Sequence, residues 1–216
     1  MTDTSLTAEL RGAVLLDQLQ PQFAATIASS SDGYFPISGE SAFWLEVRPG
    51  IVVHALLDVA LKSCDVKPGA MITERSYGTL EVHGPDQGQV RMARDLLLER
   101  IGCVQADGLR PRLLTSRVIH RIDDHQAMVI NRTRSGMLVL GKDTLYTLEV
   151  TPAVYALAAA NAAEKASGVR LVDLQNNGAV GRLQLAGSDA DVEQAVAAVE
   201  RTLAGIDGRA NDGGAD

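Results

Sequence analysis

The chain has 216 residues, of which 46% are hydrophobic and 22% are charged, and its formal net charge is −7. This length accommodates either one large domain or two domains of about 100 residues, each with its own core. The negative charge, without any basic block or aromatic stripe, argues against nucleic acid and an anionic membrane surface as partners.

The first residues, 1–5, lack the positive and apolar regions of a targeting peptide, and no apolar run approaches the roughly 18 residues of a membrane span. We therefore expect a cytoplasmic protein. Cys64 and Cys103 stand outside any CxxC or Cys/His pattern, which predicts two free thiols.

An internal repeat is the main signal in the sequence. A shift of 103 residues aligns Leu45-Glu46-Val47-x-Pro49 with Leu148-Glu149-Val150-x-Pro152. The same shift aligns Ile27 with Ile130, Gly33 with Gly136, Ala60 with Ala163, Lys62 with Lys165, Gly78 with Gly181 and Gly84 with Gly187. We place two domains at residues 10–107 and 109–205, with a joint rich in glycine and proline, and interpret residues 206–216 as a disordered, solvated tail.

Each unit is predicted to contain three strands, a helix, a hairpin and a final helix, in that order. This is an α+β fold with helices on one face of an antiparallel sheet. Pro49 and Pro152 stand where the first residue of a helix is expected, and apolar residues at helical spacing follow both. Gly168 is expected to end the second of these helices as a C′ glycine.

The end of the second unit shows a hairpin followed by a capped helix. Residues 169–175 alternate between apolar and polar side chains, and residues 182–185 continue as the neighbouring strand. Ser188 is the expected N-cap of the last helix, whose apolar stripe consists of Val192, Ala195, Val196, Val199 and Leu203.

These motifs resemble the bacterial microcompartment shell domain. They are Ala-Asn-x-Ala-Glu-Lys-Ala at 160–166, Gly-Arg-Leu at 181–183 and Gly-Ser-Asp-x-x-Val at 187–192. In single-domain members of that family the strand similar to residues 117–121 comes last, whereas here it precedes the Leu-Glu-Val strand. The order of elements is therefore similar to that of the circularly permuted tandem members.

One branch of the family is closer still. Residues 17–22, 74–78 and 129–132 are similar to the carboxysome-associated tandem shell proteins, whose trimers form a pseudohexamer with a gated pore and can stack as double discs. The resemblance implies two tandem ferredoxin-like domains and a structural role in a microcompartment shell in the cytoplasm, with no catalytic residue and no cofactor. The implied partners are copies of the same chain, other shell proteins and small metabolites.

The resemblance also assigns the pore. In the family the turn between the two hairpin strands points at the symmetry axis, which implies that these residues line or gate the pore: Glu74, Arg75, Ser76, Tyr77, Gly78, Gln175, Asn176, Asn177 and Gly178. Copies of Glu74 and Arg75 around one axis would form a plug of alternating charge. We expect glycines at 78, 178 and 181 to allow the φ values that a flip of the turn requires. The alternative is an ordinary exposed ion pair in a turn.

Lys62 and Lys165 fall at the end of the first long helix of each unit. The family places a lysine there that reaches the neighbouring disc in the shell plane. A lysine in a last helical turn is also favourable to the helix dipole, and this alternative stays open.

Other readings depend on the histidines. His120 and His125 flank two aspartates, but we expect a strand running into a turn there, which separates the side chains, so no metal site is predicted. His54 and His83 lack a nucleophile or base at matching spacing. The alternatives to a shell protein are a regulatory module that binds small molecules with tandem ferredoxin-like domains and an enzyme built on the stretch from 120 to 125.

Overall fold

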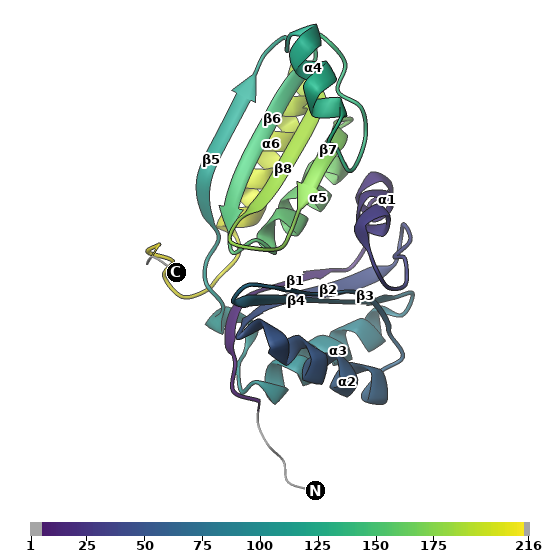
Figure 1. The fold of residues 1–216 in the computed structure, drawn as a ribbon, viewed down its shortest axis with the longest axis vertical. Helices are drawn as coiled ribbons and strands as arrows, with labels where there is room; N and C mark the ends of the chain where they lie inside the picture. The colour runs from purple at the N-terminus through teal and green to yellow at the C-terminus, as the bar shows by residue number, and fades with distance from the viewer. Residues whose placement is uncertain (1–5, 214–216) are drawn as a thin grey trace, which may run out of the picture.

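The computed structural model describes residues 6–213 and shows two units of the same topology (Figure 1). Each unit contains a four-stranded antiparallel sheet, with the order β1-β2-β4-β3 in the first and β5-β6-β8-β7 in the second. The predicted α+β class with two related units is confirmed. No helix within the described range has the length and apolar character needed to cross a bilayer.

The elements follow one another in the same order in both units. The first unit contains β1 (Glu9–Leu16), α1 (Pro21–Ser30), β2 (Ser41–Arg48), η1 (Gly50–Val52), α2 (Val53–Ser63), β3 (Lys67–Glu74), β4 (Tyr77–Gly84) and α3 (Gln87–Arg100). The short turn η2 (Gln105–Asp107) leads to the second unit, which contains β5 (Arg112–Ile119), α4 (Asp124–Asn131), β6 (Thr144–Thr151), α5 (Tyr155–Ala166), β7 (Arg170–Gln175), β8 (Gly181–Gly187) and α6 (Asp189–Ala204).

The prediction of three consecutive strands is wrong, because a short helix, α1 or α4, lies between the first two strands of each unit. Local signals for both helices were present. Pro21 occupies the first turn of α1, and the Asp123 side chain caps α4 by accepting a hydrogen bond from the His125 N–H. Figure 1 shows α4 in front of the second sheet and α6 behind it, so only the long helices share one face.

The two prolines of the repeat precede a turn and do not begin the helices. The peptide bonds before Pro49 and Pro152 are both cis, and the following helices begin at Val53 and Tyr155. Gly168 follows the C-cap residue of α5 without a left-handed φ, so the expected C′ geometry is absent.

The hairpin and the capped helix of the second unit are confirmed. β7 pairs with β8 along its length. The Ser188 side chain accepts a hydrogen bond from the Asp191 N–H, and Val196 packs partly buried beside the four buried residues of the predicted stripe.

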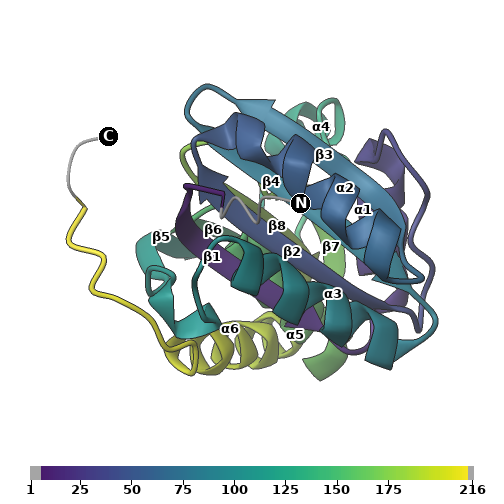
Figure 2. The same ribbon diagram turned by 90° about the horizontal axis from the view of Figure 1, so that it is seen from below.

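The helix α5 lies between the two sheets, whereas α2, at the same repeat position, lies on the outer side of the first sheet (Figures 1 and 2). Eight residues of α5 are buried but only three of α2. The many alanines of α5 allow close approach on both sides, and one apolar cluster runs from Phe23 and Trp44 of the first unit to Leu157 of α5. The units therefore share a core.

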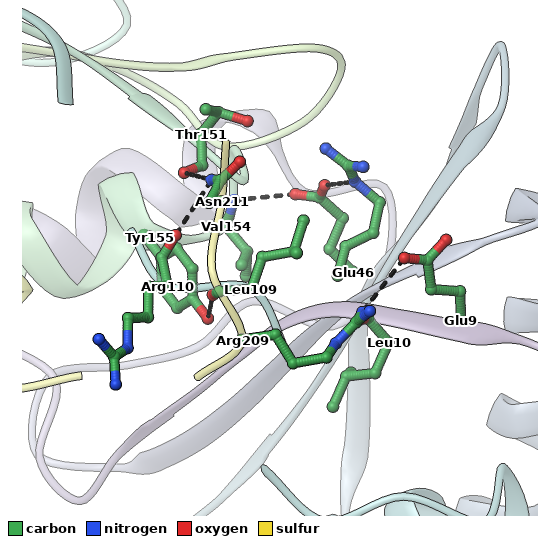
Figure 3. A network of polar contacts seen from close by, with 11 residues as sticks. Glu9, Leu10, Glu46, Leu109, Arg110, Thr151, Val154, Tyr155, Arg209 and Asn211 are labelled. Carbon is green, nitrogen blue, oxygen red and sulfur yellow. Dashed lines mark hydrogen bonds and ion pairs between the residues drawn. The ribbon is translucent and has the colours of Figure 1, made fainter. Parts of the chain in front are cut away.

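The C-terminal segment predicted as a tail is described as far as residue 213, and contacts tie it to the joint between the units. Arg209 forms a parallel bridge with Leu109 and an ion pair with Glu9 at 3.1 Å (Figure 3). Asn211 donates from its side-chain amide to two backbone carbonyls at 3.0 Å. The last three residues lie outside the described part of the chain.

Candidate functional site

The turn between β3 and β4 carries the first set of predicted pore residues. Glu74 and Tyr77 face each other across the turn, and Arg75 adopts a left-handed backbone with φ 53°. Glu74, Arg75 and Ser76 are exposed, so the tip of the hairpin offers one carboxylate, one guanidinium and one hydroxyl to a partner or to solvent.

Tyr77 and Gly78 lie at the base of this turn and are buried. The Arg11 guanidinium sits 4.0 Å from the centre of the Tyr77 ring, a cation–π contact that holds the ring in place. A Cβ on Gly78 would overlap the carbonyl oxygen of Gly50. These two residues anchor the tip and do not present side chains to solvent.

The turn between β7 and β8 carries the second set. Gln175, Asn176 and Asn177 are half-buried, and Gly178 has φ 86°. Gly178 occupies the repeat position of Arg75, so the left-handed residue recurs in both turns.

Among the three glycines expected to allow a flip of the turn, only Gly178 has a positive φ in this conformation. Gly78 and Gly181 are required for another reason. Each strand passes so close to the turn before the long helix that a Cβ would overlap a carbonyl oxygen, of Gly50 in one unit and of Ala153 in the other.

The two turns meet within one chain. The side-chain amide of Asn177 donates a hydrogen bond to Glu74 Oε2 at 3.1 Å. The backbone of Gly178 also lies against the Glu74 carboxylate, since an added Cβ would come within 2.9 Å of an oxygen of this group. Gln175 is engaged on the other side, where its amide oxygen accepts from Arg182 at 3.1 Å. The structure therefore brings the two predicted sets together at Glu74 and Asn177.

The two repeat lysines are both exposed in the last turn of their helices. Lys62 forms an ion pair with Asp58 at 2.7 Å, one turn earlier on α2. Exposed pairs of this kind contribute little to stability, so the lysine remains available for an intermolecular contact.

A buried ion pair that the sequence analysis did not single out joins the two units. Glu46 of β2 accepts a hydrogen bond from Arg11 Nε at 2.8 Å and another from the Val154 N–H at 3.1 Å, which places its carboxylate at the N-terminus of α5 (Figure 3). Burial raises the pKa of Glu46, and the Arg11 hydrogen bond opposes that shift. The signal was a glutamate inside an apolar strand, repeated at Glu149.

A second buried pair corrects the expectation that His83 has no base beside it. His83 lies within β4, fully buried, with Nδ1 2.9 Å from Glu81 Oε1 and Nε2 4.0 Å from Glu40 Oε2. Burial raises the pKa of Glu81. Because both side chains of the pair are closed off from solvent, no substrate reaches them.

His120 and His125 each pair with a different carboxylate. His120 Nδ1 lies 2.9 Å from Asp189, and His125 Nδ1 lies 3.3 Å from Asp123. Hydrogen bonds from the Thr144 hydroxyl and from His120 lower the pKa of Asp189. Within residues 6–213 no three His, Cys, Asp or Glu side chains are arranged to hold a metal ion.

The two cysteines are free, as predicted. Burial raises the pKa of both thiols, and the nearby Asp107 carboxylate adds to the shift at Cys103. A raised pKa keeps a thiol protonated at neutral pH, which makes both cysteines weak nucleophiles.

Comparison with known proteins gives matches over nearly the whole chain. Residues 10–107 match the family described as the CsoS1D N-terminal domain. The chain is 41% identical over 205 residues to the carboxysome shell protein CcmP of Synechococcus elongatus, and the match covers 95% of this chain and 96% of that protein.

Two solved structures share the fold throughout. The fused permuted hexameric shell protein MSM0275 from the RMM microcompartment is 41% identical with a TM-score of 0.90, over 93% of this chain and 99% of that one. The double ringed trimeric shell protein MSM0271 from the RMM microcompartment is 37% identical with a TM-score of 0.90, over 94% and 100% of the two chains.

Proposed function

The chain belongs to the circularly permuted tandem shell proteins of bacterial microcompartments, and from this premise we propose that three copies close into a ring around a gated pore lined by the two hairpin turns. The protein is a structural component of the shell, located within the cytoplasm, and not an enzyme. It assembles as an oligomer with other shell components. Relatives that match over at least 90% of this chain are shell proteins, which argues against the alternative of a small-molecule-binding regulatory module.

The contact between Glu74 and Asn177 is the observation that carries the pore proposal. The two residues occupy the same position of the repeat, 103 residues apart, and their side chains touch at 3.1 Å. Equivalent residues that touch lie close to the axis that relates them. In a six-fold arrangement, neighbouring equivalent points are as far from the axis as from one another, so a contact between these two side chains supports a narrow passage.

Charge balance at the axis supports a gate. Three bare carboxylates about 5 Å apart would repel by roughly 3 kcal/mol per pair at an effective dielectric of 20. The Asn177 amide holds each Glu74 carboxylate, and the adjacent Arg75 guanidinium supplies a positive charge for every negative one. The plug would open when the turn moves these side chains away from the axis, and small metabolites of the enclosed enzymes would then pass.

Shells that enclose a reporter enzyme test the gate. Assembled shells containing the wild-type ring, the Glu74→Ala ring or the Arg75→Ala ring are supplied with the enzyme's substrate from outside. We expect both variants to form rings normally and to raise substrate entry, because half of the plug is missing.

The matched control is Glu193→Ala, which removes an exposed carboxylate of α6 that belongs to neither turn. Entry rates that are equal in the Glu74, Arg75 and control variants would contradict a gating role. A crystal structure of the Glu74→Ala ring with an unchanged closed plug would do the same.

The lysines at the ends of α2 and α5 support a further part of the proposal, contact between neighbouring rings in the shell plane. Lys62 and Lys165 are exposed at equivalent positions, so a ring would carry them at its rim in six-fold repeat. We expect Lys62→Glu combined with Lys165→Glu to abolish sheets seen by electron microscopy and to spare the ring. Normal sheets would contradict this contact and would support the alternative, in which the two lysines only interact favourably with the helix dipole.

Exposed apolar loops support the stacking of two rings. In both units the loop after the short helix hydrogen-bonds through its backbone to the edge strand, at Gly33 in the first and at Gly136 in the second. Both loops expose three large apolar side chains at matching positions: Tyr34 and Met137, Phe35 and Leu138, Ile37 and Leu140. Six such loops on one face of a ring form the kind of apolar surface that marks an interface. A similar shell protein is double ringed.

The stacking is tested by light scattering. We expect wild-type particles of six chains and Phe35→Asp with Leu138→Asp particles of three. Met92→Asp, on α3, is the control, since Met92 is exposed outside these loops. Wild-type particles of three chains would contradict the stack.

A further inference from the structure

His83 lies at the base of the apolar loop of the first unit, with a carboxylate on each side of its ring. The side chain is fully buried. Its Nδ1 lies 2.9 Å from Glu81 Oε1 on the same strand, and its Nε2 lies 4.0 Å from Glu40 Oε2. Glu40 closes the loop of residues 31–40, because its Oε2 accepts a hydrogen bond from the Ile37 N–H at 3.0 Å. The histidine therefore faces the group that fastens the loop.

The trio of Glu40, Glu81 and His83 is satisfied only when a proton stands on each side of the ring. A neutral imidazole offers one N–H donor and one lone pair. Between two ionised carboxylates, one carboxylate then faces the lone pair, which repels it. Within residues 6–213, His83 Nε2 has no hydrogen-bond partner, so the nearby Glu40 carboxylate decides its charge. Burial raises the pKa of Glu81, which favours a trio that retains one more proton.

The second unit fastens its apolar loop with a permanent charge. Asp143, at the repeat position of Glu40, accepts a hydrogen bond from the Leu140 N–H at 2.6 Å. Its cation is Arg170 of β7, which also donates to the Leu138 carbonyl at 3.1 Å. Arginine is always charged in proteins. The contact between carboxylate and loop is therefore insensitive to moderate changes of pH in the second unit.

The other charged groups around His83 do not replace it. Lys67 of β3 stands opposite His83 in the sheet and at the repeat position of the arginine, but it is exposed and pairs with none of the described carboxylates. Asp32 of the loop is also exposed. The helix α1 carries no charged side chain, and Glu164 of α5 accepts hydrogen bonds from two N–H groups at its start. Among the described residues, the loop carboxylate thus pairs with no cation but His83.

In the second unit the place of the trio is apolar. Ala186 stands at the position of His83 and belongs, with Val172, to a buried apolar cluster. Val172 stands at the position of Gly69, where the first unit requires glycine because a Cβ would overlap Glu81 Oε2. Buried ionisable groups are less favourable than apolar packing unless they are fully paired. Packing alone therefore does not account for the trio.

We propose that the proton occupancy of the trio controls the apolar loop of the first unit, and through it the stacking of two rings. The inference rests on the proposed stack and names its regulation. With the additional proton, His83 attracts Glu40 and the loop is held against the sheet. When the trio loses this proton as the pH rises, Glu40 turns to water and releases the Ile37 N–H. One of the two apolar loops in every chain then loses its fixed position, and the rings separate.

Hydrogen exchange measured by mass spectrometry tests the loop itself. Rings are kept unstacked by Phe35→Ser and Leu138→Ser, so that stacking does not protect either loop. After correction for the intrinsic pH dependence of exchange, we expect exchange at Ile37 to become at least about tenfold faster between about pH 5 and about pH 9. Exchange at Leu140, held by the permanent pair, should stay within about twofold. An equal pH dependence of the two loops would overturn the inference.

Substitution of the loop carboxylates separates a switch from a merely structural contact. In Glu40→Gln, the amide oxygen accepts from the Ile37 N–H and the amide nitrogen donates to the lone pair of His83, so the loop should stay fixed at every pH. Asp143→Asn is the matched control in the second unit, and it should speed exchange at Leu140 by the same factor at every pH. A Glu40→Gln loop with the pH dependence of wild type would overturn the role of the trio.

Light scattering of the unmodified protein tests the effect on the stack. We expect particles of six chains to give way to particles of three as the pH rises from about 5 to about 9, and Glu40→Gln particles to remain at six. The three exposed histidines, His54, His120 and His125, are the control, since their joint replacement by glutamine should leave the wild-type profile.

The pH series separates this inference from the proposed function. Wild-type particles of six chains at every pH would overturn the control and leave the stack. Wild-type particles of three chains at every pH would overturn the stack and its control together. A transition that disappears in the variant without exposed histidines would also overturn the assignment to His83.

Discussion

Asn177 donates a hydrogen bond to Glu74, its own counterpart in the other half of the repeat, at 3.1 Å. The turn of the first unit offers a carboxylate at this position, and the turn of the second offers an amide. A ring with glutamate at all six positions would gather six negative charges near one axis. The asymmetry between the halves therefore allows the turns to approach.

Asn177→Asp removes this asymmetry. The change replaces a hydrogen bond by two like charges about 3 Å apart, which repel by more than 1 kcal/mol even in water. We expect the turns to separate, so that substrate entry into assembled shells rises at pH 7. Asn176→Asp is the control one residue away, and an equal effect of the two variants would contradict the role of the contact.

Gly78→Ala should lower the stability of the chain by roughly 1–3 kcal/mol, because the added methyl group overlaps the Gly50 carbonyl oxygen in a tightly packed place. Gly84→Ala, at the other end of the same strand, meets only the Asp65 carbonyl oxygen at 3.7 Å and should change stability by less than about 0.5 kcal/mol. Urea unfolding measures both. Similar losses at the two positions would show that close approach at Gly78 is not the constraint.

Glu46→Gln should destabilise the chain by about 3 kcal/mol, because it removes the charge of a buried carboxylate that pairs with the Arg11 guanidinium. Glu9→Gln is the matched control, since it removes only the exposed pair with Arg209 and should cost less than about 1 kcal/mol. Thermal unfolding at equal protein concentration distinguishes them. Losses of the same size would contradict the larger weight of the buried pair.

The stability of the chain should fall as the pH rises through the titration of Glu81. Burial raises the pKa of this carboxyl above its ordinary value of 4.5, so the folded state binds the proton more tightly than the unfolded state. The contribution is present in full below the unfolded pKa and is lost as the pH rises through the folded pKa. His83 and Glu40 are the titratable neighbours on this face, and contact with His83 opposes the shift.

Glu81→Gln tests this prediction, because an amide does not titrate. Urea midpoints of the variant should decline less than those of wild type between pH 4.5 and neutrality. The exposed Glu200→Gln should follow wild type. Parallel profiles for wild type and Glu81→Gln would contradict the prediction.

Part of the fold was predictable because it depends on local pattern. The strand pairs and the last helix follow from alternation, helical spacing and the cap at Ser188. The helix α1 was missed although Pro21 marks its start, because a short apolar run fits a strand as well as a helix. The glycines at 78 and 181 were identified as special, but close approach and not positive φ explains them.

The candidate site, like the fold, was predictable only in part. The repeat and the motifs indicated both hairpin turns. The meeting of Glu74 with Asn177, the burial of Tyr77 under Arg11 and the pairing of His83 with Glu81 were not predictable, because each depends on how strands pack side by side. Periodicity shows which face of a strand is apolar but not which polar group lies opposite.

By itself, the sequence determined the repeat, the α+β class and the shell family, because spacing and motif identity are properties of neighbouring residues. Only the tertiary structure decided that α5 is buried between two sheets while α2 stays half-exposed, and that Glu46 is covered while Glu149 is open. The physical reason is that equivalent halves of one chain have unequal surroundings, so a surface that is covered in one half stays open in the other.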